Sequence, residues 1–209
     1  MRPYSILLLG PTGAGKTPLG ELIGKNGIHG KICHHFDFGS ELRSIAELQP
    51  ADLFEVKELV FIRNVLEKGA LLENEDFPLA EKIFRRFLLR KGFRGEDLLI
   101  LNGIPRHADQ AKDMDCIADV GTVILLVCGP EDVCRRIALN SGGDRSCRVD
   151  DSLEMITKKL EIFNARTAPL IGHYAEQGCK ILELGIAADT TPEKAYKEFI
   201  EAFRLTDKS

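Results

Sequence analysis

The chain has 209 residues, 44% of them apolar, which is enough for the core of one α/β domain with small insertions. Its 28 basic and 32 acidic residues give a formal net charge of -4, which argues against a basic nucleic-acid-binding face. The apolar run before Gly10 is too short for a signal peptide, and no later run could span a membrane. We therefore expect a cytoplasmic protein that binds neither nucleic acids nor membranes.

Short apolar runs alternate with helical patterns along the chain, which is typical of a parallel sheet covered by helices. The five predicted strands are 5–9, 33–37, 98–101, 123–127 and 180–184. The predicted helices are 16–24, 40–46, 52–68, 76–91, 108–118, 130–140, 153–177 and 192–205. No repeat or linker interrupts this order, so the sequence predicts a single domain over residues 1–209.

The loop after the first predicted strand, residues 10–17, reads G-P-T-G-A-G-K-T. In such a G-x-x-x-x-G-K-[ST] loop, backbone N–H groups surround a phosphate chain, the lysine adds a point charge and the hydroxyl faces Mg²⁺. The sequence therefore predicts an α/β fold of the P-loop NTPase type, with three layers and a five-stranded parallel sheet. The predicted ATP-binding residues are Gly10, Gly13, Ala14, Gly15, Lys16 and Thr17, with Thr17 as the Mg²⁺ residue.

A second polar group follows the predicted strand 98–101. Residues 102–106 read N-G-I-P-R, and Gln110 lies one helical turn beyond Arg106. Ligands of open α/β sheets gather at the carboxyl ends of the strands. An arginine fork suits a phosphate, and a glutamine offers a paired donor and acceptor to a base edge. The segment therefore predicts contacts to a phosphate and to a base.

This segment carries a resemblance to a known family. Residues 102–110, N-G-I-P-R-x-x-x-Q, resemble the D-G-F-P-R-x-x-x-Q signature of adenylate kinases and related nucleoside monophosphate kinases. Residues 38–43, F-G-S-E-L-R, resemble the family's T-G-D-L-L-R, and residues 68–72, K-G-A-L-L, resemble its G-x-L-V turn.

The resemblance continues toward the carboxyl terminus. Residues 148–151, 156–160 and 166–174 are similar to the family's R-x-D-D, x-x-K-R-L and T-x-P-L-I-x-Y-Y motifs, in the same order and spacing. It thus extends from Ile6 to Phe203.

The resemblance implies reversible transfer of the γ-phosphoryl group of Mg-ATP to a nucleoside monophosphate, with AMP as the leading acceptor. It implies that Lys16 holds the β- and γ-phosphates, Arg43 and Arg106 hold the acceptor phosphate, Arg148 stabilises the transferring group, and Lys159 lies near the acceptor. The catalytic set is then Lys16, Arg106, Arg148 and Lys159. The monophosphate-binding set is Gly39, Arg43, Leu72, Gly103, Arg106, Gln110, Arg148 and Lys159.

The resemblance also implies a monophosphate-binding insertion at residues 38–72 and a short lid at residues 140–149. We expect no zinc, because the six cysteines contain no C-x-x-C pair and Cys147 is the lid's single cysteine. Most cysteines are expected to be small buried apolar residues. Asp150 and Asp151 are interpreted as structural lid residues. We expect the protein to act as a monomer whose partners are nucleotides.

Three departures from the family pattern lie at positions where the family has a charged residue. Asn102 stands where the family has an aspartate that helps to hold the Mg²⁺ hydration shell, so Asn102→Asp is expected to raise Mg²⁺ affinity or activity. Lys159 stands where the family has an arginine, and Asn140 stands where a lid arginine is expected. Arg145 and Arg136 are the candidates to replace that arginine.

Two alternatives to an AMP kinase remain open at this point. The charge departures favour a catalytically weakened paralogue that binds nucleotide as a sensor or scaffold. Phe38 replaces a family hydroxyl near the acceptor base, which favours a kinase for another acceptor, such as UMP, CMP or another small phosphorylated or hydroxylated molecule.

Overall fold

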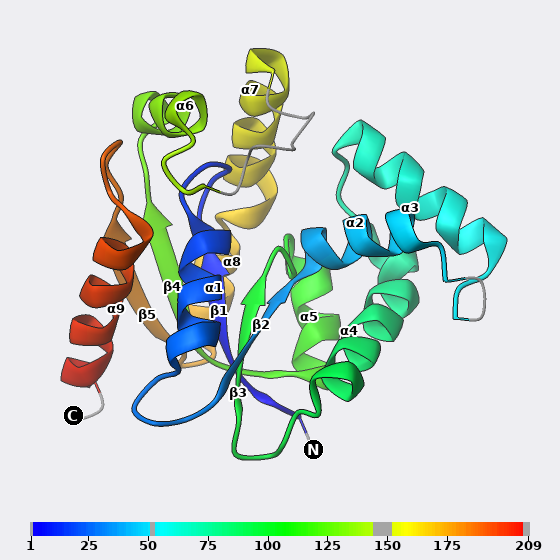
Figure 1. The fold of residues 1–209 in the computed structure, drawn as a ribbon, viewed down its shortest axis with the longest axis horizontal. Helices are drawn as coiled ribbons and strands as arrows, with labels where there is room; N and C mark the ends of the chain where they lie inside the picture. The colour runs from blue at the N-terminus through cyan, green and yellow to red at the C-terminus, as the bar shows by residue number, and fades with distance from the viewer. Residues whose placement is uncertain (1, 51–52, 144–151, 207–209) are drawn as a thin grey trace.

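The protein folds around one parallel β-sheet with strand order β2-β3-β1-β4-β5, which confirms the predicted fold class (Figure 1). The computed structural model describes residues 2–50, 53–143 and 152–206. The strands are β1 (Tyr4–Leu9), β2 (Cys33–Asp37), β3 (Leu98–Asn102), β4 (Asp119–Val127) and β5 (Lys180–Gly185).

Helices cover both faces of the sheet. They are α1 (Lys16–Asn26), α2 (Phe38–Leu48), α3 (Val56–Lys68), α4 (Phe77–Lys91), α5 (Ala108–Ile117), α6 (Pro130–Leu139), α7 (Leu153–Ile162), α8 (Leu170–Glu176) and α9 (Pro192–Thr206). None of these described helices is both long and apolar enough to cross a membrane.

The strand β1 shows how the two faces are built. Its alternate residues Ile6 and Leu8 pack with α1 and α9, whereas Leu7 and Leu9 pack with α4, α5 and α8. Successive side chains of a strand point to opposite faces, so a continuous apolar run is expected when both faces are buried. This explains why β1 was recognisable from the sequence as a central strand.

The predicted helix 153–177 is wrong in one respect, because the chain forms two helices there. Between α7 and α8 lies a π-helical turn, Phe163–Thr167, followed by Pro169. Proline has no N–H to donate and its ring collides with the preceding turn, so one straight helix cannot pass through position 169. The Thr167 hydroxyl donates to the carbonyl of Arg106 at 2.8 Å, which uses the wide turn to anchor a predicted site residue.

Two element boundaries also differ from the prediction. The strand β4 begins at Asp119, four residues before the predicted start, because Asp119 and Val120 pair with Tyr4 and Ser5 in a stretch whose polarity hides the strand. The helix α3 begins at Val56 rather than at residue 52, because the Glu55 N–H donates to the Glu58 carboxylate at 2.8 Å and caps the helix there.

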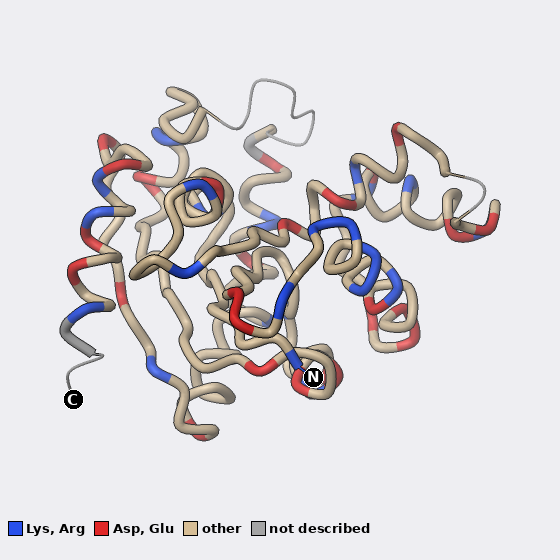
Figure 2. The backbone as a smooth tube through the Cα atoms, turned by 60° about the horizontal axis from the view of Figure 1, so that its bottom comes forward, with Lys and Arg blue, Asp and Glu red and all other residues tan. Residues whose placement is uncertain are grey.

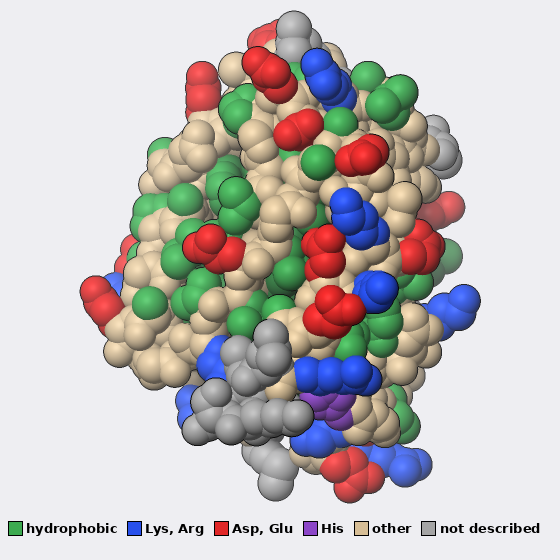
Figure 3. Space-filling model, turned by 90° about the vertical axis from the view of Figure 1, so that its left-hand side faces the viewer, with side chains coloured by type: hydrophobic (Ala, Val, Ile, Leu, Met, Phe, Trp, Pro, Cys, Tyr) green, Lys and Arg blue, Asp and Glu red, His purple; other side chains and the backbone are tan. Residues whose placement is uncertain are grey.

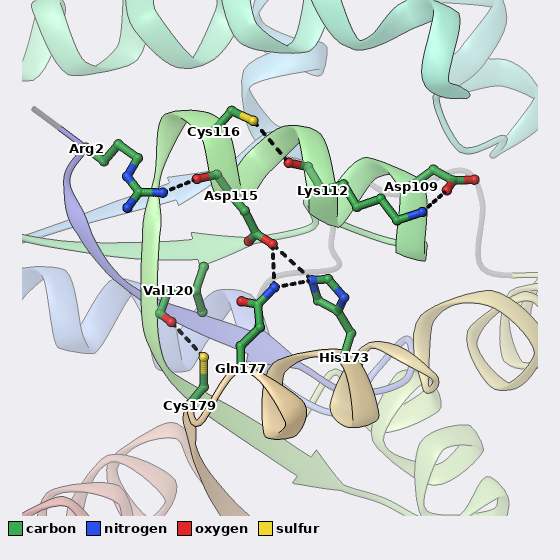
Figure 4. Close-up of polar contacts among 9 residues, drawn as sticks. All are labelled: Arg2, Asp109, Lys112, Asp115, Cys116, Val120, His173, Gln177 and Cys179. Atoms are coloured by element: carbon green, nitrogen blue, oxygen red, sulfur yellow. Dashed lines mark hydrogen bonds and ion pairs between the residues drawn. The ribbon is translucent and has the colours of Figure 1, made fainter.

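The polar contacts at the far end of α5 fasten α8 to α5 (Figure 4). The carboxylate of Asp115 accepts from Gln177 at 2.9 Å and lies 3.0 Å from His173 Nε2. Figure 4 also shows Cys116 and Cys179, which are exposed and half-buried. Of the five described cysteines only Cys33 is buried, so the expectation of mostly buried cysteines is wrong: the others lie near element ends or on outer helix faces.

Charges of both signs are spread over the molecule (Figure 2). On the face that carries α9, acidic and basic side chains lie next to one another between apolar ones (Figure 3). The charges therefore offset one another locally, in keeping with the small formal net charge of -4.

Candidate functional site

The phosphate-binding loop of residues 10–17, or P-loop, lies at the carboxyl end of β1 and leads into α1 at Lys16 (Figure 1). Gly13 and Gly15 have φ angles of 77° and 96°, which side chains of other residues rarely allow. A Cβ at Gly13 would also lie 2.9 Å from Ile137 Cγ1. These constraints explain why glycine occupies both positions. The loop conformation also places its N–H groups at the positive end of α1, where an anion is favoured.

Lys16 supplies the mobile charge of this loop. Its ammonium group donates to the carbonyls of Gly10 and Pro11, each at 2.7 Å. The lysine is thus held over the loop by backbone carbonyls, next to the start of α1. Positive charge from the side chain and from the helix end is concentrated at one point.

The P-loop hydroxyl of Thr17 faces a carboxylate that the sequence reasoning missed. It donates to Asp37 Oδ2 at 2.6 Å, and the amide of Asn102 donates to the same carboxylate at 2.8 Å. Asp37 is the last residue of β2. The rule that ligands gather at the carboxyl ends of strands could have identified it, because β2 was predicted to end at this residue.

A buried histidine lies behind this group. His35 Nε2 is 3.4 Å from the Asn102 amide, and burial lowers the pKa of His35 to about 4, although the nearby charge of Asp37 opposes the shift. The ring is therefore neutral near pH 7. A Cβ at Gly20 would lie 2.3 Å from His35 Nε2, so α1 contacts β2 through a glycine at this point.

One pocket joins the P-loop to α2, α3, α5 and α7. The predicted site residues that line it are Gly13, Gly15, Lys16, Thr17, Gly39, Arg43, Leu72, Asn102, Gly103, Arg106, Gln110 and Lys159. The two other predicted loop residues, Gly10 and Ala14, are not among the residues that line this pocket, and Ala14 is completely buried. The predicted lid residue Arg148 lies outside the described residues, together with Arg145, Cys147, Asp150 and Asp151.

The backbone of Arg106, a residue that lines the pocket, is held by two hydrogen bonds. Its backbone N–H donates to Gln110 Oε1 at 2.7 Å, and its backbone carbonyl accepts from the Thr167 hydroxyl. Burial lowers the pKa of the guanidinium and the charge of Asp37 opposes this, but an arginine remains charged in proteins. The oxygen of Gln110 thus accepts one hydrogen bond from the backbone, and its amide nitrogen can donate to a base.

Two further cations reach the pocket from different helices. Arg43 extends from α2, where its guanidinium lies beside Gly39, and Lys159 extends from α7 beside Gly69 at the end of α3. Together with Lys16 and Arg106, they bring four positive side chains, from three helices and the loop before α5, to one pocket.

The far wall of the pocket is apolar. It is formed by Phe38, Leu42, Val65, Leu66, Leu71 and Leu72. His107 fixes this wall to α5, because its Nε2 donates to the Leu72 carbonyl at 3.0 Å while its Nδ1 accepts from the Gln110 N–H at 3.3 Å. The carbonyl and the N–H determine the tautomer of the ring.

Arg136 cannot replace the lid arginine in this structure. The residue is 3% exposed, and its guanidinium donates to the carbonyls of Gly13, Ala187 and Thr190 at 2.7 to 3.0 Å. It therefore ties the P-loop to the loop after β5. Asn140 ends α6 in a left-handed conformation with φ 48°.

The chain is similar to known proteins in both sequence and fold, although no protein-family model matches it. It is 28% identical over 203 residues to an adenylate kinase of Rickettsia africae, covering 83% of this chain and 87% of that protein. It is also 28% identical to an adenylate kinase of Treponema denticola, covering 92% and 96% of the two chains.

Among solved structures, a gluconokinase from Sinorhizobium meliloti 1021 shares the fold, with a TM-score of 0.55 at 15% identity. The match covers 100% of this chain and 99% of the other. The P-loop geometry, the sequence similarity to adenylate kinases and the common fold agree. The chain is therefore a divergent relative of P-loop nucleotide kinases.

Proposed function

We propose that this protein reversibly transfers the γ-phosphoryl group of Mg-ATP to a nucleoside monophosphate, with AMP as the leading acceptor. The observation that carries the proposal is the single pocket that runs from Lys16 and Thr17 to an apolar wall, with Arg106 between them. The lining offers positive side chains for phosphate-bearing groups and an apolar wall for one flat group, which are the features that a nucleotide pair would need. The adenylate kinase relatives point in the same direction.

The acceptor end combines two kinds of recognition. Arg43 and Arg106 present guanidinium groups, which bind phosphate oxygens through two parallel hydrogen bonds. The apolar wall from Phe38 to Leu72 suits the face of a base. A small acceptor without a base would leave this wall in contact with water.

Phosphoryl transfer between two phosphates requires in-line positioning and charge stabilisation rather than a covalent group from the protein. Lys16 and the P-loop N–H groups would hold the donor phosphates, while Arg106 would stabilise charge between donor and acceptor. Thr17 and Asp37 lie side by side and offer oxygen atoms, which are the ligands that Mg²⁺ prefers. Bound Mg²⁺ would neutralise charge on the phosphate oxygens.

A second candidate is a kinase for a small hydroxylated acceptor. Asp37 lines the same pocket, and a carboxylate can accept the proton of an attacking hydroxyl. The shared fold with a gluconokinase is compatible with this chemistry. The apolar wall favours the nucleotide.

The test is ADP formation from Mg-ATP with AMP, dAMP, GMP, CMP, UMP or gluconate, each offered separately, next to a reaction without acceptor. We expect turnover with AMP to exceed that with every other acceptor, and Lys16→Ala to abolish it. Turnover with gluconate alone would move the function to the second candidate. ATP binding without acceptor-dependent turnover would instead indicate a nucleotide-binding paralogue.

A further inference from the structure

Asp37 and Asn102 end two neighbouring strands and face each other. They are register partners in the β2–β3 ladder, and Asn102 Nδ2 donates to Asp37 Oδ2 at 2.8 Å. The second carboxylate oxygen, Oδ1, accepts from the Ser40 N–H at 2.8 Å, at the start of α2. The carboxylate is thus held in one position by groups from two elements.

The Thr17 hydroxyl is oriented by this pair. Its one hydrogen is donated to Asp37 at 2.6 Å, and it accepts from Asn102 at 3.1 Å, so one lone pair of the oxygen remains. In P-loop proteins Mg²⁺ is held by the loop hydroxyl together with an aspartate on a strand end. In this chain the carboxylate beside that hydroxyl comes from β2.

Asn102 cannot supply the missing charge, because its side chain is an amide. Its NH₂ group faces Thr17 Oγ1 and Asp37 Oδ2, both of which accept hydrogen bonds, and this environment assigns the amide as a donor. An aspartate at position 102 would place a second carboxylate against Asp37, and like charges this close cannot both ionise easily.

We propose that Asp37 is the carboxylate that positions the divalent cation of the bound nucleotide, and that Asn102 is its required neutral partner. The negative charge has moved by one strand from β3 to β2. The inference rests on the proposed function, since it concerns the Mg²⁺ of bound ATP. It reverses the sequence-based expectation for Asn102→Asp, which should now bring no gain. Mg²⁺ is usually bound through one or two carboxylates together with substrate phosphates and water, which is the arrangement that this proposal assumes.

The test exchanges the acid and the amide, which have nearly the same shape. The variants are Asp37→Asn, Asn102→Asp and the double variant, with Asp119→Asn as the matched control at the opposite end of the sheet. Calorimetry would measure binding of a non-hydrolysable ATP analogue, first in EDTA and then with increasing Mg²⁺. A thermal melt of each variant would verify folding.

We expect Asp37→Asn to weaken Mg²⁺ binding to the nucleotide complex by roughly 10- to 100-fold, as is typical when a residue that orients a metal ligand is removed. Binding in EDTA should not weaken, because a negative charge near the phosphates is removed. The double variant should recover most of the lost Mg²⁺ affinity. Asn102→Asp alone should show no gain, and Asp119→Asn should match the wild type.

Wild-type Mg²⁺ affinity in Asp37→Asn would overturn the inference, as would a folded double variant no better than Asp37→Asn. A loss of turnover with unchanged Mg²⁺ affinity would also overturn it and would place Asp37 at the acceptor. If Asp37→Asn fails to fold, Asp37→Ser keeps a helix-capping oxygen and serves the same comparison. A wild type that binds ATP in neither condition would refute the proposed function itself.

Discussion

The two ends of the pocket are built in different ways. The proposed donor end is formed by one continuous loop, residues 10–17, in which backbone groups and one lysine carry the positive potential. The proposed acceptor end is formed by residues of α2, α3, α5 and α7 and of the loops before α5 and after α3, which are far apart in the sequence.

Because of this difference, the two ends tolerate different substitutions. A phosphate chain is the same in every nucleoside triphosphate, so a fixed backbone loop can serve any of them. An acceptor site must discriminate between ligands, and side chains from several elements can change one at a time. The departures at Phe38 and Lys159 lie at the acceptor end. The departure at Asn102 lies where the two ends meet.

The largest effect is expected at the donor end. Lys16→Ala should lower kcat/KM by roughly 10²- to 10³-fold or more, since under the proposed function it removes a charge that holds the donor phosphates. The melting temperature should change little, because the ammonium donates to carbonyls of the loop and is not part of the apolar core. The exposed Lys112→Ala is the control. Unfolding of Lys16→Ala would show that the donor end depends on this side chain for structure.

The acceptor end should respond to a change of geometry at constant charge. Arg106→Lys keeps the positive charge but loses the guanidinium fork, so kcat/KM for AMP should fall by roughly 10- to 100-fold. Steady-state kinetics with AMP varied would measure this, with Arg85→Lys on the outer side of α4 as the control. An unchanged kcat/KM would remove Arg106 from the acceptor site.

The close contact between Gly20 and His35, behind the junction of the two ends, can be tested by measuring the free energy of unfolding. Gly20→Ala would force a Cβ to within 2.3 to 2.7 Å of three atoms of the His35 ring, which should lower the free energy of unfolding by about 2 kcal/mol. Gly172→Ala in α8 meets nothing within 4 Å and should be neutral or stabilising. Urea unfolding of both variants would measure the difference. Equal stability of the two would contradict the close contact.

His35 should make stability depend on pH. Its pKa in the folded protein is lowered by burial to about 4 from an ordinary value of 6.5. Between pH 6.5 and about pH 4 the unfolded chain binds a proton on His35 that the folded chain does not. The contribution of neutral His35 to the free energy of unfolding is therefore fully present above pH 6.5 and is lost as the pH falls toward 4. We expect a loss of about 1 to 2 kcal/mol between pH 7 and pH 5 that His35→Gln reduces. The same slope in both proteins would assign the dependence to other groups.

The smallest effect is expected at the surface of the acceptor side. Arg166 makes two hydrogen bonds of 2.6 Å to Glu73, and these lower the pKa of Glu73. Both side chains are more than one third exposed, so Glu73→Gln should cost about 0.5 kcal/mol or less. The difference should disappear in high salt. A larger cost would mean that this pair supports the acceptor wall.

The sequence allowed the central strands and the donor loop to be predicted because each depends on adjacent residues. The apolar run of β1 and the glycines of the loop act through backbone geometry that is local. Arg106 and Gln110 could be predicted from their place after a central strand. The residues from 38–43 could be predicted only through resemblance, since nothing within that segment shows what those residues face. The break at Pro169 was visible in the sequence, but the helical periodicity on both sides of it outweighed that signal.

The sequence by itself thus determined the P-loop, the sheet and the order of the elements. Only the tertiary structure decided where the negative charge of the donor site lies. Asp37 and Asn102 are far apart in the chain, and the parallel register of β2 and β3 makes them partners. Their side chains then share one hydrogen bond and one hydroxyl, because strands that end together bring their terminal residues together.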